Sequence, residues 1–281
     1  MTGAGGDERW SRLPTAGPKH PAVAQYFAIQ NNSKPNPQRL IVLSGLWELE
    51  SGLDAGLELI ALLVSPERFR GNRAIDVFTR AERTGAPAYA VADRLATRIS
   101  DRDSWDGLAA IAVSRQWQLT DVVLGDPALV LVLDGLEVLG NVGTAVRSAQ
   151  AAGAAAVLLT NRRVRLSHPR LIHASMAASL TMPMLDCSID EAAAWLHEYD
   201  VQVLGTDTRA QTTYKAMAYR SRVALVLGSE RYGIHRDWAP HVEGSVSIPM
   251  SNGVDSLNVA NAATILLFEI ASRHRPAEFG G

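Results

Sequence analysis

Three polar segments of the chain, each at the end of an apolar run typical of a buried strand, carry the residues whose types and spacing suit chemistry. They are residues 133–147 (LDGLEVLGNVGTAVR), 227–233 (LGSERYG) and 248–258 (IPMSNGVDSLN). In open α/β sheets, ligands bind at the carboxyl ends of the strands. The three segments are therefore expected to line one pocket. The first of them ends on Arg147, and the planar fork of an arginine suits bidentate recognition of phosphate.

The glycine pattern argues against two common classes of nucleotide-binding protein. Gly140 and Gly143 fit a tight turn, but no G-x-G-x-x-G follows the first strand of this region, which argues against a classical dinucleotide fold. A G-x-x-x-x-G-K-[ST] sequence is also missing, which argues against a P-loop nucleotidase.

Cysteine and histidine usage points away from metal and disulfide chemistry. The single cysteine, Cys187, excludes an internal disulfide framework and a cysteine-based zinc site, and its apolar surroundings (MPMLDCSI) predict a buried, inert thiol. The seven histidines show no metal-ligand spacing, so no metal is expected. No apolar run approaches the roughly 20 residues that cross a bilayer, and the N-terminus lacks the apolar core of a signal peptide. We expect a soluble, cytoplasmic protein without a membrane partner.

The composition predicts a folded protein with no nucleic-acid tail. Of 281 residues, 47% are apolar and 20% are charged, with a net charge of −2, which suits one large domain or two modest ones with real cores. Because the charge is nearly balanced, any RNA-binding surface must be a local patch. Only three of the 27 basic residues are lysines. The arginine excess is explained either by a GC-rich coding bias or by a role in recognition.

The chain divides into four parts by composition and periodicity. Residues 1–20 carry Gly, Pro and charge without periodicity and are interpreted as a disordered leader. Residues 21–115 are expected to form a small α/β domain, with strands over 39–45, 59–65, 86–92 and 108–114 and helices after residue 45 and over 75–85. Residues 116–127 are interpreted as a linker, and the alternative is a surface loop inside one domain.

Residues 128–281 are expected to form a parallel α/β domain. The run 128–134 is continuously apolar, as a strand buried on both faces of a sheet requires. A helix over 141–153 is predicted with Asn141 as its N-cap and Gly153 as its terminator. Further strands and helices alternate along this part: strands over 155–160, 201–206, 223–229 and 244–250, and helices over 191–199 and 257–273.

The three polar segments, in this order and at this spacing, resemble the signature motifs of the SpoU/TrmH family of SPOUT methyltransferases. The first matches as Asn141-Val142-Gly143 with Arg147 six residues after the Asn, and the second as Leu227-Gly228-Ser229-Glu230 followed by Gly233. The third matches as Ile248-Pro249-Met250 and then Ser256-Leu257-Asn258. The resemblance covers roughly residues 128–275. The second motif departs from the pattern at Arg231-Tyr232, where many members have small or acidic residues, and this pair could adjust cofactor access or the fit of RNA.

The resemblance implies a fold, a cofactor and an assembly. Members of the family use S-adenosylmethionine to methylate a ribose 2′-hydroxyl, their sheet ends in a deep trefoil knot, and they form homodimers. The helices of the first and third motifs are therefore expected at a subunit contact. Residues 21–115 resemble, in position and size, the RNA-recognition domain that ribosomal RNA members carry ahead of the catalytic domain.

Four residues are implied to be catalytic: Arg147, Asn141, Glu230 and Asn258. Arg147 lies off the apolar face of its helix, so it is free to reach a pocket. The family proposal has this arginine activate the hydroxyl, but because a guanidinium has a pKa above about 12, stabilising the developing alkoxide or clamping the phosphate is an easier role; a surface ion pair is the plain alternative. Asn141 either caps its helix or also orients Arg147 or the ribose, and Glu230 either binds the ammonium group of the cofactor or orients Arg147.

The cofactor contacts and the RNA contacts are implied at separate positions. The cofactor residues are Thr206, Gly228, Ile248, Ser256 and Leu257, with Gly228 allowing a close backbone approach, although Ile248 and Leu257 also suit an ordinary core and Ser256 also suits an N-cap. The densest basic segment contains His168 and four arginines that are expected to contact RNA phosphate or, alternatively, to form a solvated loop: Arg162, Arg163, Arg165 and Arg170.

The sequence thus predicts an S-adenosylmethionine-dependent RNA ribose 2′-O-methyltransferase. Large-subunit ribosomal RNA is favoured as the substrate because minimal members that modify tRNA lack the N-terminal unit. The alternatives are a tRNA 2′-O-methyltransferase and a non-catalytic RNA-binding protein that kept the fold. A role in self-resistance to antibiotics that act on the ribosome stays open.

Overall fold

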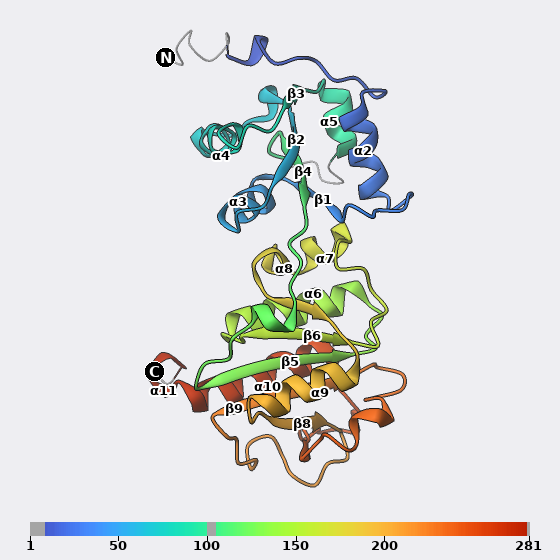
Figure 1. The fold of residues 1–281 in the computed structure, drawn as a ribbon, viewed down its shortest axis with the longest axis vertical. Coiled ribbons are helices and arrows are strands. Elements are labelled where there is room, and N and C mark those ends of the chain that lie inside the picture. The colour runs from blue at the N-terminus through green and yellow to red at the C-terminus, as the bar shows by residue number, and fades with distance from the viewer. Residues whose placement is uncertain (1–8, 100–104, 280–281) are drawn as a thin grey trace. The chain divides into compact units, whose positions relative to one another are not determined.

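The computed structural model describes residues 9–99 and 105–279, and the chain divides into two compact units (Figure 1). The first unit extends to Arg115 and includes Ser167–His173. The second comprises Gln116–Leu166 and the chain from Ala174 onward. No helix in the described part is both long and apolar enough to cross a membrane.

The first unit is a four-stranded sheet with helices on both faces. Its strands lie in the order β1 (Leu40–Ser44), β4 (Leu108–Val113), β2 (Leu59–Val64), β3 (Ala88–Ala90), with β4 antiparallel to both neighbours and β3 parallel to β2. Helices α2 (Pro21–Gln30) and α5 (Asp93–Ile99) cover one face, and α3 (Leu46–Asp54) and α4 (Asn72–Glu82) lie on the other (Figure 1). The four predicted strands and the predicted helices of this unit are confirmed, whereas α2 and α5 were not expected.

The segment interpreted as a disordered leader is ordered where the structure describes it, and residues 1–8 lie outside the described residues. Thr15 forms a parallel bridge with Ala90, the Ala16 N–H donates to the Ala90 carbonyl at 2.8 Å, and the Ala90 N–H donates to the Pro14 carbonyl at 3.0 Å. The ring of Trp10 also packs edge-on against Phe69 at a centroid distance of 5.2 Å. The interpretation is therefore wrong for these residues. Their backbone is ordered by hydrogen bonds to the edge of β3, which composition alone does not predict.

The segment 116–127 packs into the second unit instead of forming a free linker. It contains the 3-10 turn η2 (Leu119–Asp121), and the side chains of Val122 and Leu124 are buried in the core of that unit. The alternative, a surface loop inside one domain, is correct in that the segment belongs to one unit, but the segment is not confined to the surface.

The second unit is built on six parallel strands, as the continuous apolar runs predicted. Their order is β10 (Gly244–Val246), β8 (Gln202–Thr206), β9 (Arg222–Gly228), β5 (Ala128–Asp134), β6 (Ala156–Thr160) and β7 (Met184–Asp186). Strand β5 pairs with β9 along its whole length, from Ala128 opposite Arg222 to Asp134 opposite Gly228. Every residue of β5 is buried, which explains why the strand is continuously apolar as far as Leu133.

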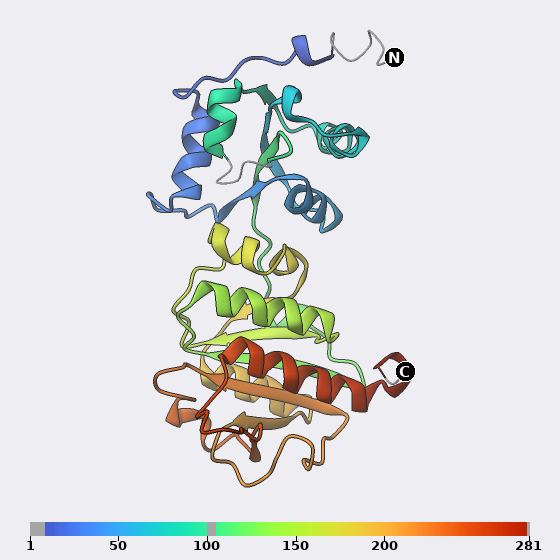
Figure 2. The same ribbon diagram turned by 180° about the vertical axis from the view of Figure 1, so that it is seen from behind.

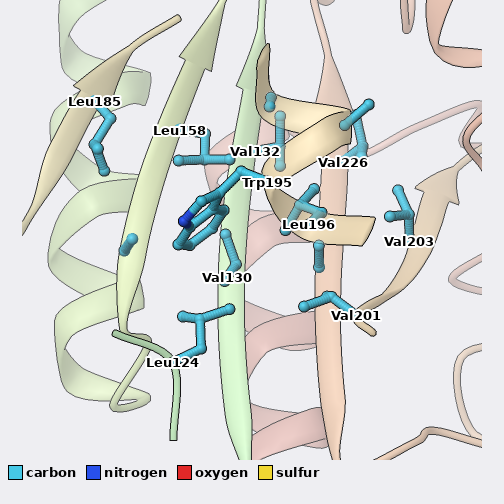
Figure 3. Close-up of a cluster of buried hydrophobic side chains, with 14 of the residues drawn as sticks. Leu124, Val130, Val132, Leu158, Leu185, Trp195, Leu196, Val201, Val203 and Val226 are labelled. Atoms are coloured by element: carbon cyan, nitrogen blue, oxygen red, sulfur yellow. The ribbon is translucent and has the colours of Figure 1, made fainter. Parts of the chain in front are cut away.

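Helices cover both faces of this sheet. Helix α9 (Ile189–Glu198) packs on one face, where Trp195 and Leu196 meet Val130, Val132 and other strand side chains (Figure 3). Helices α6 (Leu139–Ala151) and α10 (Val259–His274) lie on the opposite face and run side by side (Figure 2). The remaining elements are shorter: α7 (Pro169–Ala174), α8 (Ala178–Thr181), η1 (Pro66–Arg68), η3 (Arg236–Trp238) and α11 (Pro276–Phe279).

The predicted cap of one helix and the alternative cap considered for another are wrong, and one helix terminator is confirmed. Helix α6 begins at Leu139, so Asn141 lies inside the first turn and the N-cap position belongs to Val138. Helix α10 begins at Val259 with Asn258 as its N-cap, so Ser256 is not a cap. Gly153 ends α6 as expected, with a left-handed φ of +69° that a glycine adopts without strain.

Cys187 is half-buried, not fully buried, but its chemistry agrees with an inert thiol. Burial first, and then the nearby carboxylates of Glu191 and Asp186, raise the pKa of the thiol to about 12. The thiol therefore stays protonated at neutral pH and is a poor nucleophile.

A buried carboxylate, Asp134, joins the carboxyl ends of two strands to a later loop. Its Oδ1 accepts hydrogen bonds from the Thr160 hydroxyl and the Asn161 amide, both at 2.8 Å, and its Oδ2 accepts one from the His235 backbone N–H at 2.7 Å. Asp134 is 2% exposed, so these three donors replace the water that a carboxylate otherwise requires.

Replacing Asp134 with Ala is expected to lower the free energy of unfolding by about 3–5 kcal/mol, because three donors then lose a charged acceptor. Urea unfolding followed by tryptophan fluorescence measures the change. Asp190→Ala, at an exposed position in the first turn of α9, is the control and is expected to cost at most about 1 kcal/mol. Equal effects of the two variants would contradict this role of Asp134.

Candidate active site

A cleft of about 860 Å³ opens at the carboxyl ends of β8, β9 and β10. The second and third polar segments line it together, and Leu227, Ile248 and Leu266 give it apolar walls. The five residues expected at the cofactor all belong to its lining: Thr206, Gly228, Ile248, Ser256 and Leu257. The first segment does not line the cleft but reaches its edge through Asn141.

Gly228 is required by a reversal of the chain at the end of β9. Ser229 and Gly233 exchange backbone hydrogen bonds at 3.1 and 2.9 Å, which closes a tight turn. A Cβ on Gly228 would lie 2.0 Å from the Gly233 carbonyl carbon and 2.1 Å from the Ile234 nitrogen. From the sequence, Gly228 was expected to allow close approach of a cofactor. The structure shows that it also allows close approach of the backbone at Gly233 and Ile234.

Three of the four predicted catalytic residues form one hydrogen-bonded cluster, which contains one residue from each motif. The Asn141 Nδ2 donates to Glu230 Oε1, and the Asn258 Nδ2 donates to Asn141 Oδ1 at 3.0 Å. Asn258 Oδ1 accepts from the Ala260 N–H at 2.9 Å, which caps α10. The Ala260 N–H requires an oxygen, which fixes the orientation of the Asn258 amide and, through it, that of the Asn141 amide. The Nδ2 of Asn141 then donates to Glu230.

Arg147 is not part of this cluster. It lies six residues after Asn141, about 9 Å further along the helix axis, and it is exposed while Val142, Ala145, Val146 and Ala149 on the apolar face are fully buried. The prediction that Arg147 lies off the apolar face is confirmed. Within residues 9–99 and 105–279 its side chain has no hydrogen-bond or ion-pair partner, and it does not line the cleft.

The cleft offers the groups that S-adenosylmethionine requires. Its apolar side chains suit an adenine ring, and the carboxylates of Asp207, Glu230 and Asp255 suit a ligand with ammonium and sulfonium charges. The backbone N–H groups of Ile248 and Leu257 donate to no acceptor in the described part of the chain. Backbone donors that have no acceptor among the described residues, beside apolar walls, are what a heterocyclic base needs, so the residues present fit this cofactor.

The basic segment after β6 is divided between different environments. The Arg162 Nε forms an ion pair with Asp186 at 2.7 Å. Arg163 and Arg165 are exposed in the second unit, whereas Arg170 lies in α7, in the stretch that clusters with the first unit. Arg162 therefore already has a carboxylate partner.

Sequence reasoning missed two residues that shape the site. Asp134, the one acid in the apolar run of β5, supports the loop at His235, and an acid inside an otherwise apolar strand was the signal that could have revealed it. Thr264 was also missed: its hydroxyl lies 2.6 Å from that of Ser148 and links α10 to α6. Among the described residues, no group of three or more His, Cys, Asp or Glu side chains has a metal-binding arrangement.

A parallel α/β sheet with a polar cleft at the carboxyl ends of its strands defines the class of cofactor-binding α/β proteins. The SpoU rRNA Methylase family matches residues 128–268, and the chain belongs to this family. The predicted family and the predicted α/β fold class are thereby confirmed.

Similarity to individual proteins extends over most of the chain. The 23S rRNA (guanosine-2′-O-)-methyltransferase RlmB of Xylella fastidiosa is 30% identical over 80% of this chain and 93% of that protein. A solved structure titled RNA 2′-O ribose methyltransferase is 29% identical with a TM-score of 0.77, over 94% of this chain and 100% of that one. The AdoMet-bound rRNA methyltransferase of Sinorhizobium meliloti has a TM-score of 0.82 at 24% identity, over 94% and 98% of the two chains, and shows the shared fold.

Gly228→Ala is expected to open the turn after β9 and to abolish cofactor binding, because the added methyl group meets backbone atoms that cannot move independently. Isothermal titration calorimetry with S-adenosylmethionine measures this loss. Gly140→Ala in α6 is the control, since its Cβ meets nothing within 4 Å. It is expected to retain binding and to gain up to about 1 kcal/mol in stability. Normal cofactor affinity in Gly228→Ala would contradict the close approach.

Proposed function

We propose that this chain transfers the methyl group of S-adenosylmethionine to a ribose 2′-hydroxyl of large-subunit ribosomal RNA. The observation that carries the proposal is the Glu230–Asn141–Asn258 cluster at the edge of a cleft whose lining fits the cofactor. Relatives that are named for guanosine 2′-O-methylation of 23S rRNA make a guanosine of that RNA the first substrate to test. Such a substrate belongs to the cytoplasm, which is the proposed location of the protein.

When bound, S-adenosylmethionine supplies an electrophilic methyl group on its sulfonium. The chain must then hold the cofactor, position the ribose and stabilise negative charge on the 2′-oxygen as its proton leaves. Thr206, Gly228, Ile248, Ser256 and Leu257 are the proposed cofactor residues. The cluster of Asn141, Glu230 and Asn258 is proposed to orient the ribose at the edge of the cleft.

Arg147 is proposed to bind RNA phosphate or to stabilise the developing alkoxide. A guanidinium is a permanent cation with five donors and no acceptor, so it is poorly suited to accept a proton. Its exposure on α6 leaves it accessible to an anionic substrate.

RNA recognition is proposed to use basic residues in both units. Residues 21–115 are the proposed RNA-recognition domain, and Arg163, Arg165 and Arg170 are the proposed phosphate contacts beside β6 and α7. Arg162 is a weaker phosphate contact because its guanidinium already pairs with Asp186.

The trefoil knot of the family is proposed for the second unit. The loop after β8 forms two backbone hydrogen bonds with Ser247, the residue after β10. The Ser247 N–H donates to the Thr212 carbonyl at 3.0 Å, and the Tyr214 N–H donates to the Ser247 carbonyl at 2.9 Å. This tight association of segments about 35 residues apart supports a threaded C-terminal segment.

Purified protein is expected to transfer a labelled methyl group to 23S rRNA, and mapping of ribose methylation identifies the nucleotide. Arg147→Ala is expected to lower this transfer by at least about 100-fold while the calorimetric cofactor affinity stays within about twofold. Arg147→Lys keeps the positive charge but removes the planar fork, so it tests which of the two matters. Gln150→Ala, three residues further along the same helix, is the control for structural damage to α6.

Transfer to tRNA but not to rRNA would replace the proposed substrate. Tight cofactor binding with no transfer to any RNA would favour the non-catalytic binding protein. A fully active Arg147→Ala variant would remove Arg147 from catalysis.

A homodimer through α6 and α10 is also proposed, because large apolar side chains remain exposed there: Val138 is 52% exposed and Phe268 is 37% exposed. Light scattering at micromolar concentration is expected to give twice the mass of the chain. Phe268→Glu is expected to shift the protein towards the monomer, whereas Val123→Glu, at an exposed apolar side chain outside both helices, is expected to leave the dimer intact. A wild-type monomer at these concentrations would contradict the proposal.

A further inference from the structure

Tyr232 is a large aromatic side chain exposed at the rim of the cleft. Its side chain is 74% exposed, and it belongs to the cleft lining. The backbone beneath it is fixed: the Tyr232 N–H donates to the Ser229 Oγ at 3.1 Å, inside the turn that the Ser229 and Gly233 backbones close. A ring held in solvent by a rigid turn gains little stability for the fold, and its place in the lining leaves it accessible to a ligand of the cleft.

Arg231 adds a positive charge to this ring. Its guanidinium carbon lies 5.2 Å from the centroid of the Tyr232 ring, within the range of a cation–π contact. In the described part of the chain, the Tyr232 ring meets no other aromatic or cationic group. The guanidinium therefore lies over the aromatic ring, and among the described residues neither side chain has a further partner.

The charge of the pair distinguishes between the two ligands of the cleft. The cofactor carries a sulfonium and an ammonium charge against a single carboxylate, so its net charge is positive and a guanidinium disfavours it, whereas every linkage of RNA presents a phosphate that a guanidinium binds. Tyr232 also follows Glu230 by two residues, so the turn lies next to the cluster proposed to orient the ribose. These observations favour RNA over the cofactor as the partner of the ring.

We propose that Tyr232 is a stacking platform for an unpaired nucleobase at or beside the methylated nucleotide, with Arg231 contacting the adjoining phosphate. This inference rests on the proposed function and names the form of RNA that the site takes. Aromatic side chains stack on bases of any sequence, so the platform selects an unstacked nucleotide and not a particular base. The substrate is then a loop, bulge or single strand at the modified position, not a continuous duplex.

Tyr232→Ala is expected to weaken RNA binding by about 5- to 150-fold, the range that loss of one stacked base gives. Fluorescence anisotropy with a labelled rRNA fragment measures the Kd, and methyl transfer gives the KM for RNA, which is expected to rise in parallel. Tyr232→Phe, which keeps the ring, is the matched control and is expected to bind as the wild type does. Arg231→Ala is expected to weaken binding and to reduce its dependence on salt concentration.

RNA that lacks one base identifies the stacked nucleotide. In fragments made abasic at the modified position or at either neighbour, one fragment is expected to bind the wild type and Tyr232→Ala equally well, because the base that stacks is gone. If no position removes the difference, or if Tyr232→Ala binds intact RNA as the wild type does, the platform is excluded. A calorimetric loss of cofactor affinity in Tyr232→Ala with unchanged RNA binding would assign the ring to the cofactor instead.

Different experimental outcomes would overturn this inference and the proposed function. A wild-type protein that methylates no RNA overturns the function, whatever Tyr232 does. A wild-type protein that methylates rRNA with Tyr232→Ala equal to it in Kd and KM overturns the platform alone.

Discussion

The arrangement of the site depends on one series of hydrogen bonds that begins at a helix end. The Ala260 N–H at the start of α10 needs an acceptor and takes the Asn258 oxygen, which turns the Asn258 amide towards Asn141 and the Asn141 amide towards Glu230. Helix capping, a local need of the backbone, thereby sets the direction of side chains that lie 89 and 117 positions apart along the chain. The carboxylate at the end of the series is the group left to meet a ligand.

The order of the strands makes this contact possible. From β5 the chain proceeds to β6 and β7 on one side of β5, crosses to β8 on the other side, and then forms β9 between β8 and β5. The loops after β5 and β9 therefore emerge as neighbours, and these loops lead to Asn141 and Glu230. A reversal of this kind is the place where open α/β sheets bind ligands. Asp134 strengthens the same edge because it holds the end of β5 to β6 and to the loop at His235.

The sequence predicted elements well where burial alone determines the residue pattern. Strand β5 was predicted with both ends correct, since a strand covered on two faces needs apolar residues along its length, as from Ala128 to Leu133. The predictions failed where a distant partner decides the structure. Residues 14–16 pair with β3, and Val122 and Leu124 enter a core formed by later strands. The site shows the same division: motif spacing predicted the cleft lining, but no local pattern reveals that Asn141 points to Glu230 instead of capping its own helix.

The contrast between Arg147 and the cluster bears on the role of the arginine. Asn141, Glu230 and Asn258 are held by the chain itself, so their geometry exists before any ligand arrives. Arg147 is exposed, makes no hydrogen bond or ion pair with the described residues, and stands on a separate face of the helix that delivers Asn141. A long cationic side chain without an internal partner keeps its conformational freedom until an anion fixes it. A group that becomes ordered only with an anionic substrate is better suited to binding phosphate or an alkoxide than to removing a proton. A general base must be positioned and unprotonated, and a guanidinium stays protonated.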